Sequence, residues 1–388
     1  MEKKKRQHYV PQFYLRNFVR EDNKFTIFNI KSEKIIENAP YRKQCYEDYY
    51  YGDDEVWEEK LGAIESSAAL IIAKINKQSN YYPDVEEIKI LKKFILYQRY
   101  RTIRNKDNLL NMRWDGAKTY VEMNLRKEGK YVSENTLKVL KKEFEKRYDR
   151  IIPQQALEIT ANLLDNIEDL KLLIIQYNNK IHNLISSDNP VIFYNPFYKR
   201  AVGLINAGLI ILLPISPSKL IVIFDSKMYQ RYKNNKIVKL TNENEVKMLN
   251  IFQLIVAKEI VYFQNKCQAQ FIEIYYKKNK DKRALFEELG KPQAMGTDTN
   301  KMIAYPQQFI PIDYNFSFGK VHPKGIGFIE NEIDWFPRKR DEVYEDRMRT
   351  KPEIFKNLPP LKGKFSKKNI KNIERFNRFV YDYWNNKL

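Results

Sequence analysis

The hydrophobic pattern changes its period near the middle of the chain, and this change limits the possible folds more than any other feature. Between residues 54 and 166, apolar side chains recur every three to four positions, as in amphipathic helices. After residue 170 they form short runs of strand length, of which LIILLPI at residues 209–215 is the longest. We therefore expect an α+β fold. It would have a mainly helical N-terminal two-fifths with a small hairpin, then a mostly antiparallel sheet and a basic C-terminal extension.

Turn and start signals divide this pattern into elements. The segment KFTIFNIKSEKIIE at residues 24–37 predicts the hairpin, and Pro83 with Asp84 predicts a helix start. The other expected helices span residues 54–75, 107–128, 134–150, 153–166 and 244–263, with a short one after Pro11. The expected strands span residues 171–179, 181–187, 191–196, 208–216 and 219–225. The SPSK turn makes the last two strands adjacent and antiparallel.

The length of 388 residues allows two or three domains. Residues 1–276 predict one α+β core. Residues 277–388 are richer in Gly, Pro and charge, and predict a looser extension that closes with an amphipathic helix at residues 372–384. The apolar side of that helix favours a docked helix with a basic rim over a free tail.

Several classes of protein are excluded by composition. No apolar run approaches the roughly 20 residues of a membrane-spanning helix, and the N-terminus lacks the apolar region of a secretory signal. Only two cysteines, Cys45 and Cys267, are present, which excludes a disulfide framework and a cysteine-based zinc module. We expect a cytoplasmic protein with no membrane partner.

Charge is clustered as well as abundant. The formal net charge is +20, and basic residues outnumber acidic ones eleven to three over Lys89–Lys127 and twelve to three over Arg347–Leu388. Such clusters are typical of a surface that binds nucleic acid, although a solvated lysine surface explains them equally well. The opposite cluster, Glu47–Glu59, holds seven acids and no base. It could shield the basic surface, dock a protein partner, or begin a helix.

No strong catalytic signature is present, but the N-terminal segment HYVPQFYLRNF holds a candidate residue. His8 precedes Pro11, which rigidifies the start of a short helix. A histidine held there could transfer protons near neutral pH. The alternative is a packing histidine that bonds a backbone carbonyl.

Two further groups of polar residues are candidates for a functional site, in addition to His8. SSDNP at residues 186–190 could present Asp188 as a partner of His8 or as a metal ligand, although turn chemistry also explains this motif. The basic end of the helix that follows Asp84 carries Arg101 and Arg104 on one face, where their planar groups suit phosphate oxygens. Glu65 points inward from the preceding helix, and a structural Glu65–Arg101 pair is the alternative to catalysis.

Taken together, these segments resemble the bacterial domain-of-unknown-function family 4238. The likeness covers about residues 5–270 and rests on HYVPQFYLRNF, YEDYYYG at residues 46–52, QRYRTIR at residues 98–104, SSDNP, and the PISP turn at residues 214–217. The resemblance implies a cytoplasmic bacterial α+β protein, often encoded in defence islands. It also implies that the polar residues recurring in the motifs converge in one site. These residues are His8, Gln12, Glu65, Arg101, Asp188 and Asn189.

We therefore interpret the chain as a nuclease-like effector of antiviral defence or toxin type that acts on RNA in preference to DNA. The expected catalytic residues are His8, Asp188, Glu65 and Arg101. The expected substrate-binding residues are Gln12, Arg104, Asn189, Lys92, Lys93 and Arg99. Either no cofactor or a divalent ion such as Mg²⁺ is expected, with Asp188 and Glu65 as its ligands. The alternative is a non-catalytic subunit that binds nucleic acid, or that docks a protein through Glu47–Glu59 or residues 277–388. We also predict that the HYVPQFYLRNF and SSDNP segments meet in the fold.

Overall fold

The computed structural model describes residues 5–53, 56–127, 129, 131–177, 183–196, 203–229, 234–264, 266–289, 293–295, 302–304 and 308–319. The C-terminal helix expected at residues 372–384 lies outside the described residues. No helix in the described part of the chain is long and apolar enough to cross a membrane.

A five-stranded sheet forms the centre of the fold. Its strands are β5 (Lys171–Tyr177), β7 (Ile192–Tyr194), β8 (Ile210–Ser216), β9 (Lys219–Phe224) and β10 (Ile237–Leu240). They lie in the order β10-β5-β9-β8-β7, and every neighbouring pair is antiparallel except β10 with β5. The predicted mostly antiparallel sheet and its β8–β9 hairpin are confirmed.

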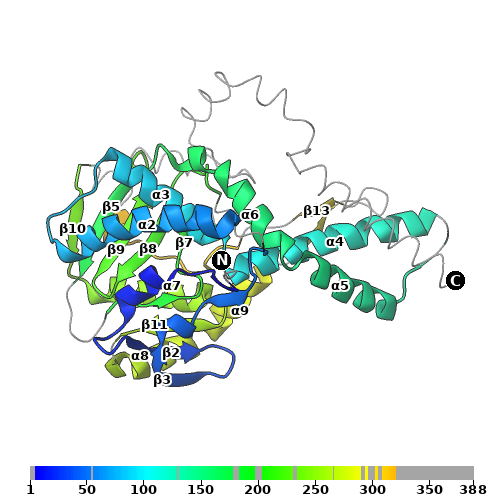
Figure 1. Cartoon of the computed structure of the whole chain (residues 1–388), viewed down its shortest axis with the longest axis horizontal. Coiled ribbons are helices and arrows are strands. Elements are labelled where there is room, and N and C mark those ends of the chain that lie inside the picture. The colour runs from blue at the N-terminus through cyan, green and yellow to red at the C-terminus, as the bar shows by residue number, and fades with distance from the viewer. Residues whose placement is uncertain are drawn as a thin grey trace, which may run out of the picture.

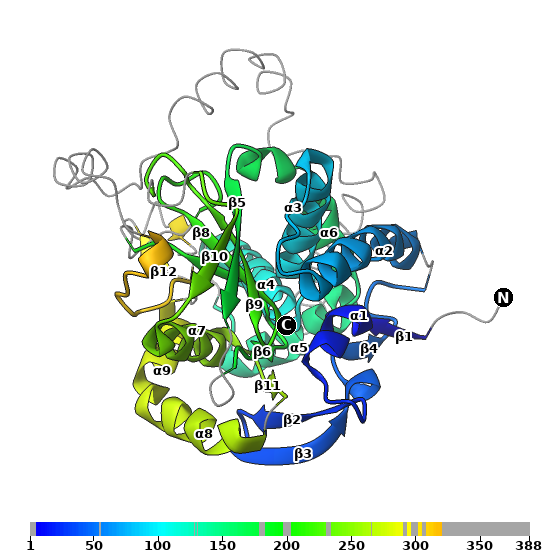
Figure 2. The same cartoon turned by 90° about the vertical axis from the view of Figure 1, so that its left-hand side faces the viewer.

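Helices cover both faces of this sheet. Side chains alternate along a strand, so Ile211 and Leu213 of β8 point to one side and Leu212 to the other. The first side packs against α2 (Val56–Lys77) and α3 (Val85–Tyr100), and the second against α7 (Glu243–Val256). Figure 2 shows the sheet between these helices. Burial on both faces explains why the strands are continuous apolar runs.

The N-terminal helices begin where the sequence predicts. Asp84 caps α3 by accepting a hydrogen bond from the Glu87 backbone, and the Glu87 side chain accepts one from the Asp84 backbone. This reciprocal pair satisfies two of the amide donors that a helix start leaves free. Glu58 and Glu59 of the acidic run lie in the first turn of α2, where the helix dipole favours negative charge.

A second sheet of four strands lies beside the first. Its order is β3-β2-β11-β6, and all neighbours are antiparallel. The predicted hairpin is confirmed as β2 (Lys24–Asn29) and β3 (Lys34–Pro40). The other strands are β6 (Ser186–Ser187) and β11 (Ile260–Phe263), and a separate pair joins β1 (Arg6–His8) to β4 (Tyr46–Asp48).

Two boundaries in this region differ from the sequence prediction. The helix expected over residues 244–263 ends at Val256, and Ile260–Phe263 is a strand paired with β2 and β6. The helical spacing of Val256 and Ile260 hid this change, and pairing with distant strands decided it. The strand expected over residues 181–187 is formed only at Ser186–Ser187 among its described residues.

Three helices follow α3, as predicted, and two of them form an arm. They are α4 (Ile103–Lys127), α5 (Glu134–Tyr148) and α6 (Ile151–Ala161). Figure 1 shows α4 and α5 projecting from the layered body as an antiparallel pair. The arm has a hydrophobic cluster of its own, in which the Trp114 ring lies 5.7 Å from the ring of Phe144.

The chain remains packed on the body beyond residue 276. That expected boundary falls inside α8 (Ala269–Lys278), which is followed by α9 (Lys280–Leu289). Phe286 of α9, together with Phe316 and Phe318, belongs to the hydrophobic cluster that also contains the α7 side chains. The remaining elements are α1 (Gln12–Leu15), β12 (Gln293–Met295), β13 (Met302–Ala304) and 3-10 turns at Arg16–Phe18, Tyr41–Lys43, Leu164–Ile167, Lys266–Gln268 and Ser317–Gly319.

Candidate functional site

The N-terminal motif and the SSDNP segment meet in the fold, as predicted. The hydroxyl of Tyr14 lies 2.8 Å from the hydroxyl of Ser186 and donates a hydrogen bond to the carbonyl of Pro214 at 2.6 Å. All three residues belong to motifs that are far apart in the sequence. The motif residues then separate into two clusters, one around Arg101 and one around Asp188.

Arg101 is a buried cation at the end of α3. Its side chain is 1% exposed, yet its Nη1 donates to Glu65 Oε1 at 2.6 Å and its Nε donates to Gln98 Oε1 at 2.9 Å. Its Nη2 is also buried and has no hydrogen-bond partner in the described part of the chain. Burial opposes the charge of Arg101, but the Glu65 carboxylate offsets this and the pKa of Arg101 is raised. A charged guanidinium therefore keeps one edge without a well-formed hydrogen bond, and the Tyr51 hydroxyl lies close enough to Arg101 to interact with it.

Two side chains connect Arg101 to the strand that carries His8. Gln98 donates from Nε2 to the carbonyl of Tyr9 at 3.1 Å, while Tyr51 donates from its hydroxyl to the carbonyl of His8 at 3.2 Å. Burial raises the pKa of the Tyr51 phenol, and the nearby Arg101 cation opposes that shift. Arg101 and the His8 backbone thus border the same polar region.

His8 lies at the accessible side of this region. It is half-buried, its Nε2 lies 3.1 Å from Gln12 Nε2, and its ring lies 5.5 Å from the ring of Tyr46. Gln12 and Glu65 are half-buried too, so three polar side chains of the region reach solvent. We call the whole set the Arg101 site: His8, Gln12, Tyr51, Glu65, Gln98 and Arg101.

Asp188 lies in the second cluster and holds a turn of the backbone. Its carboxylate accepts hydrogen bonds from the amides of Lys258 at 2.8 Å, Glu259 at 2.6 Å and Ile260 at 3.0 Å. Burial raises the pKa of Asp188, and the three amide donors oppose that shift. The carboxylate therefore fixes the change of direction between α7 and β11. Within the described residues it makes no hydrogen bond with His8.

The carboxylates expected to bind a metal have internal hydrogen-bond partners in this structure. Both oxygens of Asp188 face amide hydrogens, and the Glu65 carboxylate faces the cation of Arg101. Among the described residues, no group of three or more His, Cys, Asp or Glu side chains is placed to hold a metal ion. Internal donors therefore occupy both oxygens of Asp188 and Oε1 of Glu65.

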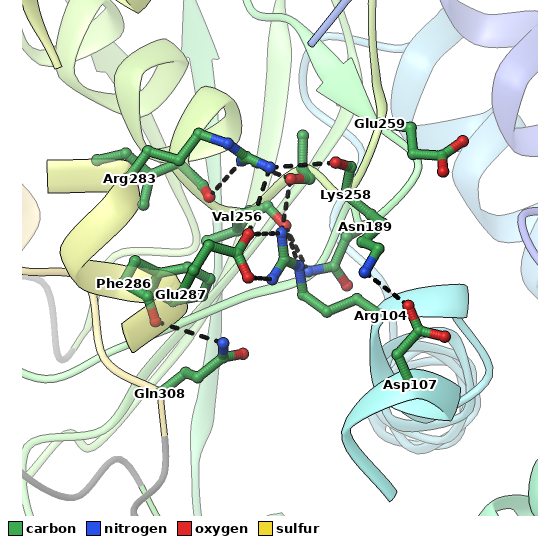
Figure 3. Close-up of polar contacts among 12 residues, drawn as sticks. Arg104, Asp107, Asn189, Val256, Lys258, Glu259, Arg283, Phe286, Glu287 and Gln308 are labelled. Atoms are coloured by element: carbon green, nitrogen blue, oxygen red, sulfur yellow. Dashed lines mark hydrogen bonds and ion pairs between the residues drawn. The ribbon is translucent and has the colours of Figure 1, made fainter. Parts of the chain in front are cut away.

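Arg104 belongs to the second cluster as well. Figure 3 shows its guanidinium between the end of α7 and α9. Its Nε donates to Val256 O at 2.8 Å, its Nη2 donates to Ala257 O at 2.7 Å, and both Nη atoms bind the Glu287 carboxylate at 2.9 and 2.7 Å. Arg104 is 2% exposed. It closes the open carbonyl end of α7 and has no edge left for a phosphate.

Most of the other expected substrate-binding residues make contacts inside the protein. Asn189 is fully buried; its Oδ1 accepts from Arg99 at 3.3 Å and its Nδ2 donates to Val256 O at 2.9 Å. Lys92 is buried and donates to the carbonyls of Glu168 and Leu170. Among these candidates, Lys93 is the one that is exposed on the surface. Internal contacts therefore account for Asn189, Arg99 and Lys92.

The sequence of the chain also matches a protein family. The model of a family described as a protein of unknown function (DUF4238) matches residues 6–267. The chain belongs to the DUF4238 family. The match covers every element from β1 to β11 and the whole Arg101 site, but it ends before α8 and before α9, which completes the second cluster. Searches of curated proteins and of solved structures gave no match.

Sequence reasoning missed several residues of both clusters in this DUF4238 chain. Gln98 and Tyr51 stand inside the QRYRTIR and YEDYYYG motifs, but the helical period places Gln98 on the packing face of its helix. Glu287 and Arg283 of α9 lie outside the matched segment and carry no motif. Arg283 donates to the carbonyls of Leu254, Ile255, Ala257 and Lys258, as Figure 3 shows in part. Only the fold brings α9 to this position.

Proposed function

We propose that this DUF4238 protein cleaves phosphodiester bonds of nucleic acid at the Arg101 site, in RNA in preference to DNA. The free Nη2 of Arg101 carries the proposal. Buried donors are almost always paired, so a buried and unpaired one needs an explanation such as a ligand. A guanidinium fork suits phosphate oxygens, and its partner Glu65 is 27% exposed and therefore displaceable by an incoming anion.

The neighbouring side chains supply the other parts of the reaction. His8 would accept the proton of the attacking 2′-hydroxyl while the bond from that oxygen to phosphorus forms. The bond from phosphorus to the 5′ oxygen breaks, and water at this half-exposed site protonates the leaving oxygen. Arg101 would stabilise the negative charge that develops on the phosphoryl oxygens. Gln12 is the positioning residue for the His8 ring.

This mechanism uses fewer residues than the sequence suggested. Asp188, Asn189 and Arg104 are engaged by the backbone and by α9, so they have no part in it. Their role is to hold the α3–α4 junction against the end of α7. The three-residue core of the proposal is His8, Glu65 and Arg101.

A second candidate function is binding without cleavage. The 2.6 Å contact between Arg101 and Glu65, with Arg101 only 1% exposed, favours a pair that ties α2 to α3. In that case the exposed basic side chains would bind nucleic acid or a protein partner, and His8 would be a packing residue beside Tyr46.

Incubation of the purified protein with tRNA, total RNA and plasmid DNA separates the two candidates. The reactions would contain Mg²⁺ or EDTA. We expect RNA cleavage that is lost in His8→Ala and in His8→Gln, because glutamine retains a hydrogen-bonding side chain but cannot titrate near neutral pH. Both variants should unfold thermally within about 2 °C of the parent protein. Cleavage by His8→Gln at the parent rate would refute the proposal.

The proposed cellular role is an effector of antiviral defence or a toxin, which rests on the resemblance to DUF4238 proteins alone. Expression of the chain in a bacterial host tests it. Growth arrest or a fall in phage plaque number that requires His8 supports the role, and equal effects of the parent and His8→Gln chains would contradict it.

A further inference from the structure

We propose that the outer face of α5 docks the sugar–phosphate backbone of double-stranded nucleic acid. Lys138, Lys142 and Lys146 lie four residues apart on α5, and all three are exposed. We call them the α5 lysine row. Figure 1 shows α5 on the arm that projects from the layered body.

The α5 lysine row lies opposite the packed side of its helix. Leu140, Phe144 and Tyr148 of α5 are buried in the cluster of the arm with Trp114 of α4. Each residue turns an α-helix by about 100°, so the row falls on the far side from these three side chains. The same spacing leads to the exposed Glu134 at the start of α5 and to the exposed Arg150 just beyond its end.

In the described part of the chain, the three ammonium groups of the row stay out of direct ion pairs, while the acids Glu134, Glu143, Glu145 and Asp149 lie on the same helix or directly after it. Among the described residues, Lys138, Lys142 and Lys146 form no ion pair, whereas Lys141 on the flank of the helix pairs with Glu145 at 3.7 Å. Like charges four residues apart repel and destabilise a helix. A polyanion bound along the row would attract each lysine and screen the repulsion between them.

The regular spacing favours a nucleic acid duplex as that polyanion. Successive lysines lie about 6 Å apart along the axis, so the row spans about 12 Å. A duplex carries one phosphate charge per roughly 1.7 Å of its axis, so several phosphates face the row at once. The side chains beside the lysines include Asn135, Val139, Glu143 and Glu145, and none of them is aromatic. Single-strand sites use aromatic stacking, so this face favours duplex regions.

This inference rests on the proposed function for the class of polymer, and it adds where the duplex part of a substrate is held. It concerns binding alone. Binding is therefore measured separately from cleavage, and it is repeated with Arg101→Lys. If no cleavage is found, the affinity measurement still tests the α5 lysine row. If the row does not bind duplexes, the cleavage measurement still tests the Arg101 site.

The test compares two triple charge reversals in the full chain. K138E/K142E/K146E changes the row, and K31E/K34E/K43E makes the same change in net charge at exposed positions near the β2–β3 hairpin. Fluorescence anisotropy at two salt concentrations would report affinity for a generic RNA duplex, a DNA duplex and a single-stranded RNA. Thermal unfolding would check each variant, with K138Q/K142Q/K146Q as a milder change.

We expect the row variant to bind the duplexes about 10- to 100-fold more weakly. We also expect the slope of log affinity against log salt to fall by about 3, because each lost phosphate contact contributes about 0.9. The control should retain the parent slope within about one contact. Three results would overturn the proposal. They are equal losses of affinity in both variants, tighter binding of single-stranded RNA than of the duplexes by the parent protein, and binding of polyglutamate without binding of the duplexes.

Discussion

Arg101 and Glu65 show how the site depends on individual side chains. The pair joins α2 to α3 at 2.6 Å while the cation is almost fully buried. Removing one member of a buried pair leaves an uncompensated charge, which costs more than the pair contributes. The same contact that stabilises the fold therefore also keeps the guanidinium charged and fixed for a ligand.

Glu65→Ala should lower the free energy of unfolding by about 2–4 kcal/mol, because Arg101 loses its counter-ion. Glu65→Gln retains an acceptor for Nη1 and should cost about half as much. Urea unfolding would measure both. Ser66→Ala is the matched control, since its exposed hydroxyl bonds only the carbonyl of Gly62 in its own helix. Equal costs for Glu65→Ala and Ser66→Ala would refute the assigned role.

Asp188→Asn tests the second cluster at the same scale. The amide nitrogen of asparagine cannot accept from the amides of Lys258, Glu259 or Ile260, so at least one buried donor loses its partner. We expect a loss of about 2–4 kcal/mol in unfolding free energy. The exposed Asp53→Asn should change it by less than about 0.5 kcal/mol. A stable Asp188→Asn protein that loses RNA cleavage would instead return Asp188 to the catalytic residues.

The sequence identifies the residue types of the site better than their roles. The motifs predict His8, Glu65 and Arg101, and a structural Glu65–Arg101 pair is one of the two alternatives that they leave open. Arg104 appears equivalent to Arg101 in the sequence because three residues separate them on a helix. The structure distinguishes them through Glu287, whose contact with Arg104 spans 183 residues and leaves no local trace.

At the scale of elements, α9 holds the end of α7 in place through Arg283 and Glu287, and we call these contacts the α9 latch. Glu287 binds both Nη atoms of Arg104, and Arg283 of the same helix donates to four carbonyls at the end of α7. Burial alone would raise the pKa of Glu287, but the hydrogen bonds and charge of Arg104 overcome this and lower it. The latch is therefore sensitive to acid.

The lowered pKa of Glu287 predicts a pH dependence with a definite sign. Its stabilising effect is fully present above the pKa of an unfolded glutamate, about 4.5, and is lost as the pH falls through the lower folded value. Relative to the intrinsic rate at each pH, hydrogen exchange of α9 and the last turn of α7 should therefore accelerate below about pH 4.5. In Glu287→Gln it should be fast already at neutral pH and lack this dependence. Asp281→Asn on the same helix is the control, and an unchanged profile in Glu287→Gln would contradict the latch.

Element types were predicted where local signals agree with the final packing. Asp84 and Glu87 fix the start of α3 from adjacent positions, and the β8–β9 hairpin closes over a two-residue turn. The α7–β11 boundary failed because Val256 and Ile260 have helical spacing in either case. Backbone pairing with β2 and the carboxylate of Asp188 decide it, and both come from distant parts of the chain.

At the scale of the whole molecule, the DUF4238 match is smaller than the folded unit. Phe286, Phe316 and Phe318 are buried with α7 although they follow the matched residues 6–267. A chain ending at residue 267 should therefore lose several kcal/mol of unfolding free energy and aggregate, because burying one such ring stabilises by about 1.5–3 kcal/mol. A chain ending at residue 319 should have a melting temperature within about 5 °C of that of the full chain. Calorimetry of both chains decides this, and a stable product ending at residue 267 would contradict the account.

At this scale the proposed activity requires that Arg101 binds a phosphate through its Nη2 edge. Side-chain NMR of arginine-labelled protein, titrated with a ribonucleoside 3′-monophosphate, tests it most directly. We predict a saturable shift of one buried guanidinium signal, absent from Arg101→Lys, while the Arg104 signal stays fixed because Glu287 and two carbonyls fill its donors. A titration that leaves the Arg101 signal unmoved would contradict the assignment of the site.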